Sequence, residues 1–262
     1  MTSKFRNFAR RFLPAPIRKP LGNLWGGLRE FVALPIQGLI FDLSGGKFRA
    51  DGCIYVIPKK ITQLTFRACF FNNTYEIDER KLVQKFIQPE DSVLELGACL
   101  GIVSCITNKR LRDQTRHLVV EANPRCIPTL RQNRDLNQCA FVIENCAVSN
   151  ASQVTFFLHP DFIVGGTTQK ASALPVQVAG RSLQQLYDQH GPFSVLIMDI
   201  EGSELEILES SKDTLRHFRL VILEMHDWII SAEGVSRCRE ILGQLGFKLA
   251  DRSQITEAWI RT

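Results

Sequence analysis

Residues 93–101 have the sequence VLELGACLG, an apolar run with one acid that ends in a turn containing two glycines. The first four residues are typical of a buried strand, and the helical pattern of residues 101–112 follows directly. Glycines at such a turn let a ligand approach the backbone N–H groups at the start of the helix. This strand–turn–helix unit predicts an α/β fold with a ligand site at the carboxyl ends of parallel strands.

Apolar runs and helical patterns alternate along the rest of the chain, as they do in βαβ units. We expect further strands at 117–121, 141–148, 154–158, 194–199 and 220–224, and helices at 125–136, 182–189, 203–210 and 235–245. Two consecutive strands, 247–250 and 255–260, predict a closing hairpin that adds an antiparallel strand to the sheet.

The N-terminal part of the chain has a different pattern. Residues 31–43 form an apolar run that is interrupted by polar residues and too short to span a bilayer, so we expect a core segment, or at most an interfacial one. A strand at 54–57 and a helix at 79–87 predict a cap against the sheet. The chain is therefore expected to consist of a basic N-terminal extension and cap over residues 1–75 and a main domain over residues 76–262.

Positive charge is concentrated at the N-terminus. Residues 1–30 hold seven basic side chains and one acid, whereas the other 232 residues hold 25 basic and 26 acidic side chains. Nucleic-acid binding needs a broad cationic surface on the main domain, so we expect no nucleic-acid partner. Phe5, Phe8 and Phe12 recur at helical spacing among the basic residues. Residues 1–20 therefore predict peripheral contact with an anionic membrane, or else a helix docked on the domain or a frayed terminus.

The eight cysteines include no CxxC pair and have no zinc-like spacing to the five histidines. We interpret them as reduced thiols in a reducing compartment. No secretory signal is expected, because Arg10 and Arg11 interrupt its apolar region. The expected location is cytoplasmic, with a peripheral position at the inner membrane face as the alternative.

Three predicted strands end in groups that suit an adenosine-containing ligand. Glu95 suits an ammonium group, Glu121 can accept both hydroxyls of a ribose, and Asn145 can bind the exocyclic amine of adenine. Cys99 stands where the middle glycine of a dinucleotide fingerprint would be, which disfavours a nicotinamide-dependent oxidoreductase. Structural alternatives are a tight turn at Gly97, a helix cap at Glu121 and a surface turn at Asn145.

Acids gather at the ends of the predicted strands 194–199 and 220–224. Asp199 ends an apolar strand, where a carboxylate costs free energy unless it is paired, and Glu201 follows it. His226 lies beyond the tip of the neighbouring strand, two residues after Glu224. The structural alternatives are that Glu201 only stabilises the start of the following helix, through its dipole, and that His226 is a buried core residue.

The combination of these motifs resembles the FkbM family of S-adenosylmethionine-dependent methyltransferases over about residues 76–226. The resemblance implies a Rossmann-like, doubly wound and mostly parallel seven-stranded sheet with an antiparallel last strand. It also implies O-methyl transfer from S-adenosylmethionine to a hydroxyl of a sugar, glycan or glycosylated metabolite. Two departures are Glu95, where the family usually has Asp, and Met198, where it often has Lys.

The residue patterns and the resemblance together assign the site. Asp199 or His226 is expected to accept the hydroxyl proton while Glu201 orients the acceptor. No metal is included in the predicted site, and the alternative is that these acids hold a divalent metal. Residues 164–169 are either polyol contacts or an ordinary connection. The cofactor contacts are expected at Glu95, Gly97, Ala98, Gly101, Glu121, Asn123, Asn145 and Ala147.

Two further functions remain open at this point. A nucleic-acid methyltransferase would share the cofactor site but would need positive charge on the main domain, and would usually carry an Asn-Pro-Pro-aromatic tetrapeptide after the fourth strand, which this chain lacks. A non-catalytic adenosine-binding or scaffold protein at the membrane surface would keep the nucleoside contacts without turnover.

Overall fold

The structure, a computed structural model, describes residues 32–158, 165–166 and 174–261. These residues belong to two compact units that meet in sequence at Ile77 and Asp78. The basic segment 1–31 and most of the loop 164–169 lie outside the described residues. Within the described part of the chain, no helix is both long enough and apolar enough to cross a bilayer.

The described residues of the first unit form two helices and a hairpin. Gly38 allows the two helices to approach closely, since a Cβ atom there would lie 1.9 Å from the carbonyl oxygen of Leu64. The side chains of Phe48, Tyr55 and Phe70 pack together behind the hairpin. Its elements are α3 (Leu34–Leu43), β1 (Lys47–Ala50), β2 (Cys53–Val56) and α4 (Leu64–Phe71).

Helix α3 is less buried than its sequence predicts. Only Gly38 and Phe41 of this helix are buried. Of the two expectations for 31–43, the core segment is therefore wrong for one face of the helix, because its apolar side chains recur at helical spacing on the exposed side, and the interfacial segment stays a prediction. The exposed apolar residues are Val32, Ile36, Leu39, Ile40 and Leu43.

The second unit contains the seven-stranded sheet that the resemblance implies. Its strand order is β12-β13-β11-β10-β3-β4-β5. Only β13 runs against the others, because it pairs antiparallel with both β11 and β12 while the remaining pairs are parallel. The predicted α/β fold and closing hairpin are confirmed. The strands are β3 (Val93–Leu96), β4 (His117–Val120), β5 (Val142–Glu144), β10 (Val195–Met198), β11 (Leu220–Glu224), β12 (Phe247–Ser253) and β13 (Thr256–Arg261).

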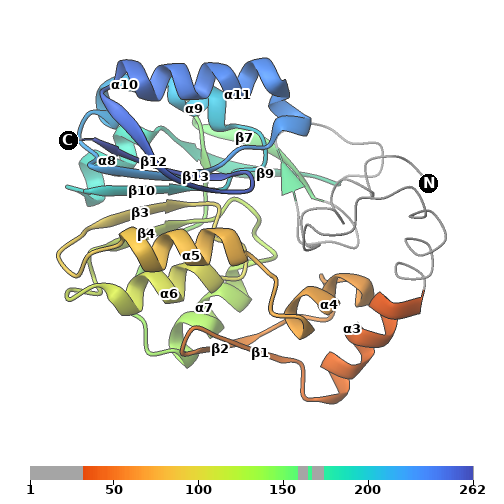
Figure 1. The fold of residues 1–262 in the computed structure, drawn as a ribbon. Helices are drawn as coiled ribbons and strands as arrows, with labels where there is room; N and C mark the ends of the chain where they lie inside the picture. The colour runs from red at the N-terminus through yellow and green to blue at the C-terminus, as the bar shows by residue number, and fades with distance from the viewer. Residues whose placement is uncertain (1–31, 159–164, 167–173, 262) are drawn as a thin grey trace. The chain divides into compact units, whose positions relative to one another are not determined.

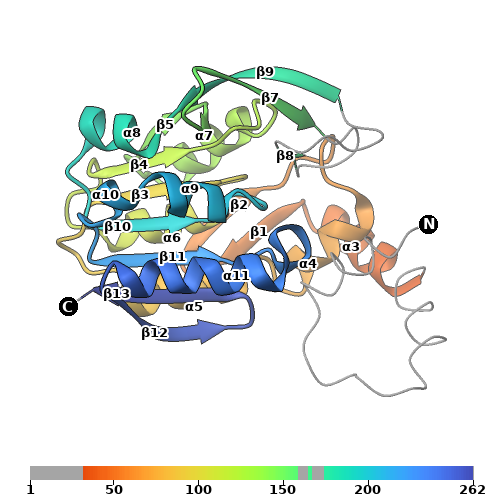
Figure 2. The same ribbon diagram turned by 90° about the horizontal axis from the view of Figure 1, so that it is seen from above.

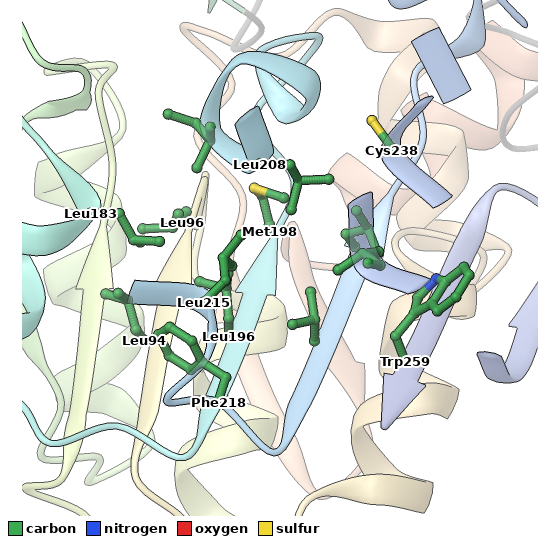
Figure 3. Close-up of a cluster of buried hydrophobic side chains, with 14 of the residues drawn as sticks. Leu94, Leu96, Leu183, Leu196, Met198, Leu208, Leu215, Phe218, Cys238 and Trp259 are labelled. Carbon is green, nitrogen blue, oxygen red and sulfur yellow. The ribbon is translucent and has the colours of Figure 1, made fainter. Parts of the chain in front are cut away.

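Helices cover both faces of this sheet (Figures 1 and 2). One face carries α5 (Ile77–Phe86), α6 (Ile102–Arg110) and α7 (Ile127–Leu136). The other face carries α8 (Leu183–His190), α9 (Glu204–Ser210), α10 (Lys212–Leu215) and α11 (Asp227–Gln244). Figure 3 shows the core beneath this second set, where alternate residues of the central strands meet leucines of the helices. Because the sheet is covered on both sides, only the strand ends can present polar groups.

Two predicted elements differ in the structure. The strand expected over 141–148 is divided, because Asn145 turns the chain and donates a hydrogen bond to the carbonyl oxygen of Glu121. Its second part belongs to a separate sheet of order β6-β9-β7-β8, in which the strand over 174–181 was not predicted. Helix α11 begins eight residues before the predicted helix and is interrupted at Ser231. The second sheet contains β6 (Ala147–Val148), β7 (Gln153–Leu158), β8 (Gly165–Gly166) and β9 (Leu174–Arg181).

The turn after β3 depends on the absence of a side chain at Gly97. Its φ is +89°, and a Cβ atom there would lie 1.7 Å from the carbonyl oxygen of Asp199. That oxygen belongs to the backbone at the end of the neighbouring strand, so it cannot move aside without opening the sheet. Gly97 is therefore fixed by close packing of two strand ends.

We predict that Gly97→Ala lowers the free energy of unfolding by about 3 kcal/mol, because it combines backbone overlap with an unfavourable φ. Urea unfolding followed by circular dichroism measures the change. The matched control is Gly243→Ala near the end of α11, where nothing lies within 4 Å of the new Cβ atom. This control should be neutral or stabilising by up to about 1 kcal/mol. Equal stability of the two variants would contradict the packing argument.

Candidate functional site

The carboxyl ends of four neighbouring parallel strands, β11, β10, β3 and β4, lie at one edge of the sheet. The loops that follow these strands contain eight of the eleven residues that the sequence predicts for the site. This is the edge at which ligands bind in open α/β sheets.

Glu95 lies within β3 and points away from this edge. It is buried, and its Oε1 atom accepts a hydrogen bond of 2.5 Å from the Ser104 hydroxyl. Its Oε2 atom lies 3.1 Å from Nε2 of His117. The pleat of the strand turns Glu95 toward α6, whereas the sequence predicts a contact with an ammonium group. The structure places this carboxylate in a supporting position beneath the turn.

The two glycines of the turn are explained by packing. Gly97 faces the backbone of Asp199, and a Cβ atom on Gly101 would lie 2.5 Å from Leu130 of α7. Ala98, between them, is buried. Cys99 has a φ of +50°, which is unusual for a residue with a side chain. The turn thus holds its backbone in one shape immediately before α6, and Gly101 leaves that helix without a side-chain cap.

Glu121 connects the turn after β3 to the loop after β4. Its two carboxylate oxygens accept hydrogen bonds of 2.6 Å from the backbone N–H groups of Cys99 and Asn123. Burial raises the pKa of Glu121 to about 7, although these two N–H groups oppose the rise; the charges of Asp199 and Glu95 add to it. A carboxylate so placed can both fix the turn and bind hydroxyl groups.

The remaining predicted cofactor residues have mainly supporting contacts. The Asn123 side chain accepts a hydrogen bond from the N–H of Arg125 at the loop before α7. Asn145 is exposed, and its Nδ2 atom donates to the Glu121 carbonyl oxygen at 2.7 Å. Ala147 lies in a small apolar cluster with Phe156 of the second sheet. Of these three, only Asn145 presents its side chain at the sheet edge.

Asp199, Glu201 and His226 come together, as the sequence predicts. The His226 side chain is fully buried, and its Nε2 atom lies 3.3 Å from Oδ1 of Asp199 and 3.5 Å from Oε2 of Glu201. The side chains of Asp199 and Glu201 are 14% and 24% exposed. The two carboxylates therefore lie between the buried imidazole and solvent.

Two further acids complete this group and are absent from the predicted set. Oε1 of the fully buried Glu204 lies 2.6 Å from Nδ1 of His226 and accepts a hydrogen bond from the N–H of Gly202. Oε1 of Glu224, at the end of β11, lies 3.7 Å from Nε2 of His226. A signal was present in the sequence, since Glu204 follows Glu201 by three residues and Glu224 precedes His226 by two. We call Asp199, Glu201, Glu204, Glu224 and His226 the acid–histidine cluster.

The carboxylates determine the charge state of the imidazole. Burial by itself lowers the pKa of His226, but the Glu201 charge, hydrogen bonding to Asp199 and Glu204 and the Asp199 charge outweigh it. The net effect raises this pKa well above its usual range. The cluster therefore favours a positive charge at the position of the imidazole.

The turn after β10 is conformationally strained. Glu201 has a φ of +52°, which costs a residue with a side chain about 1 kcal/mol. Gly202 follows with a φ of +103°, and a Cβ atom there would lie 2.3 Å from Ile229. Strain of this kind persists where the surrounding structure requires it and often accompanies function.

Comparison with known proteins identifies the family. The model of the methyltransferase FkbM domain matches residues 95–249. The chain belongs to this family. It is therefore an S-adenosylmethionine-dependent methyltransferase, as the motifs predict. No curated protein matches the chain.

Solved structures of other methyltransferases are similar over much of the chain. TYW2 of M. jannaschii in complex with AdoMet is 14% identical with a TM-score of 0.47, over 82% of this chain and 86% of that one. Precorrin-6y C5,15-methyltransferase of Geobacter metallireducens is 11% identical with a TM-score of 0.45, over 70% and 87%.

The donor groups at the sheet edge fit the family's cofactor. A carboxylate at the end of β4 suits a ribose diol, and the exposed Asn145 amide lies on the next loop. The start of α6 has no side-chain cap, so its first turn can offer backbone N–H groups, whereas those of Gly97, Ala98 and Gly101 already donate to backbone carbonyl oxygens. Glu95 is the exception, because Ser104 and His117 already engage its carboxylate.

Proposed function

We propose that this methyltransferase transfers its methyl group to a hydroxyl oxygen of a sugar, glycan or glycosylated metabolite. The observation that carries the proposal is the pair of partly exposed carboxylates, Asp199 and Glu201, above the buried His226. Carboxylates bind hydroxyl groups well and can accept their protons. The slight negative charge of residues 31–262 disfavours a nucleic-acid acceptor, whose phosphates these acids would repel.

For the cofactor, we assign the ribose hydroxyls to Glu121 and the adenine amine to Asn145. The turn of Gly97, Ala98 and Gly101 lies near the methionine part and lets it approach the backbone closely, although the N–H groups of all three residues are bonded within the protein. When bound, S-adenosylmethionine supplies an activated methyl group on a sulfonium centre. Glu95, Asn123 and Ala147 then act by holding the loops in place, which their buried contacts support.

The exposure of each side chain decides which groups can bind the acceptor. His226 is fully buried, so Asp199 and Glu201 contact the hydroxyl while His226 positions them. One carboxylate accepts the hydroxyl proton during attack and the other orients the acceptor. Glu204 fixes His226 through Nδ1 and fixes the strained turn through the N–H of Gly202.

An acceptor screen tests the proposed function directly. Purified protein is incubated with S-adenosylmethionine labelled in its methyl group and with panels of glycans, glycosylated metabolites, RNA and DNA. We expect the labelled methyl group on the oxygen of a former sugar hydroxyl. The resulting methyl ether should resist mild base. Label on nucleic acid alone would replace the proposal with the nucleic-acid alternative. Cofactor binding without transfer to any panel would favour the non-catalytic alternative.

We predict that Asp199→Asn and Glu201→Gln each lower turnover by about 10²–10⁴-fold, because each removes a carboxylate that acts on the acceptor hydroxyl. Cofactor affinity, measured by calorimetric titration, should change by less than about threefold. Glu206→Gln on the exposed face of α9 is the matched control and should leave both quantities unchanged. Turnover within twofold of the parent protein in both variants would remove these residues from the mechanism.

We predict that cofactor affinity depends on pH through Glu121. Because the pKa of Glu121 is raised to about 7, the acid protonates as the pH falls, and its protonated form accepts fewer hydrogen bonds from ribose. Affinity should therefore fall about tenfold from pH 8 to pH 6 and level off above pH 8. Calorimetry on Glu121→Gln should show about tenfold weaker binding at pH 8 and no such pH dependence. An unchanged pH dependence in this variant would assign the effect to another group.

We also propose that the N-terminal part of the chain contacts an anionic membrane surface. The exposed apolar face of α3 supports this, and residues 1–30, with seven basic side chains and one acid, precede it in sequence. Apolar side chains can enter the headgroup region while basic residues are attracted to anionic lipid.

Vesicle co-sedimentation of the full chain tests this contact. Binding to phosphatidylserine-containing vesicles should weaken at high salt and be absent with neutral lipid. The double variant Ile36→Asp, Leu43→Asp should bind at least about tenfold more weakly. Leu249→Asp, at an exposed apolar residue of β12, is the matched control. Equal binding by the double variant and the control would contradict the role of α3.

A further inference from the structure

We propose that Asp199, Glu224 and His226 form a binding site for a divalent cation. The cation would lie within the acid–histidine cluster and act on the acceptor hydroxyl. Its catalytic role rests on the proposed function, but its binding does not.

The spacing of the ligand atoms is that of a cation site. One ligand atom from each of the three residues lies within 4.8 Å of the other two. Nε2 of His226 lies 3.3 Å from the Asp199 oxygen and 3.7 Å from the Glu224 oxygen. Two ligands about 2.1 Å from one ion are separated by about 3.0 Å in octahedral and about 3.4 Å in tetrahedral geometry. Small side-chain movements would therefore suffice for coordination.

The second observation is the orientation of the imidazole. Nε2 of His226 is completely buried, and it forms no well-aligned hydrogen bond: its three carboxylate neighbours, Asp199, Glu201 and Glu224, lie 3.3, 3.5 and 3.7 Å away. Nδ1 is held by Glu204 at 2.6 Å. A histidine that donates Nδ1–H to a carboxylate directs Nε2 outward, which is the usual arrangement of a metal-binding histidine and its supporting acid, and the cation would take the place of the Nε2 proton.

The ligand types indicate the class of cation. Carboxylates favour hard cations such as Mg²⁺ and Mn²⁺, whereas imidazole favours first-row transition metals. A mixed set of two carboxylates and one imidazole therefore fits Mn²⁺ best among the common divalent cations, with Zn²⁺ as a competitor and Ca²⁺ disfavoured. This choice makes Mn²⁺ the probe for the site.

A cation here would divide the roles of the acids. It would coordinate the acceptor hydroxyl and lower its pKa, as bound divalent metals do for water. The hydroxyl proton passes to Glu201, which is outside the ligand set. The new oxygen–carbon bond forms as the carbon–sulfur bond breaks, and the electron pair of the broken bond stays on sulfur. The products are a methyl ether, a thioether and protonated Glu201.

Direct titration of the full chain tests the site. The protein is treated with chelator, transferred to metal-free buffer and titrated with Mn²⁺, and free Mn²⁺ is measured by electron paramagnetic resonance. We expect one Mn²⁺ per chain. Glu224→Gln and His226→Gln should weaken binding by on the order of 100-fold, and Glu204→Gln by about 10–100-fold. Glu206→Gln is the control and should bind as the parent protein does.

Circular dichroism and thermal unfolding show whether each variant is folded. If His226→Gln does not fold, Glu224→Gln and Glu204→Gln still decide the question. Absence of binding at millimolar Mn²⁺ and Zn²⁺, or unchanged binding in the folded variants, would overturn the cation site. Cation binding without methyl transfer would support the site and contradict only the proposed function. Methyl transfer that persists in chelator without cation binding would contradict only the site.

Discussion

The close approach of Gly97 to the carbonyl oxygen of Asp199 is the constraint on which the site depends. It brings the turn after β3, which we assign to the cofactor, against the strand end that carries Asp199 and Glu201, which we assign to the acceptor. Any side chain at Gly97 would separate the two. The distance between the loops that we propose bind the nucleoside and the acids that we propose act on the acceptor is therefore set by backbone packing, which is more rigid than side-chain packing.

Glu121 extends this constraint to the next strand. Its carboxylate accepts hydrogen bonds from the N–H groups of Cys99 and Asn123, so that one buried acid connects the loops after β3 and β4. Burial of a carboxylate is costly unless it is hydrogen-bonded, and the raised pKa of Glu121 reflects that cost. On the acceptor side, His226 balances the charge of its acidic neighbours, and Glu204 holds both His226 and the turn at Gly202. In both places a buried charged group holds loops in position through hydrogen bonds: Glu121 after β3 and β4, and Glu204 after β10.

Most of the fold was predictable because its signals are local. The buried strands at Val93–Leu96 and Leu220–Glu224 are short apolar runs bounded by turns, and helix α8 begins with a capping box of Ser182 and Gln185. The strand β9 was not predictable in this way, since most of its side chains are exposed or half-buried and it pairs within a small separate sheet. The break between β5 and β6 depends on Asn145 and the Glu121 carbonyl oxygen, which are 24 residues apart.

The sequence by itself determined the fold class, the family motifs and which chain segments carry the acids, because strand and turn patterns are local and parallel strands end at one edge. Only the tertiary structure decided what each acid does. It turned Glu95 inward to Ser104 and His117, made Glu204 the support of His226, and brought Glu224 within 3.7 Å of the imidazole. The physical reason is that side-chain direction and charge depend on contacts between residues distant in sequence, and no local pattern records those contacts.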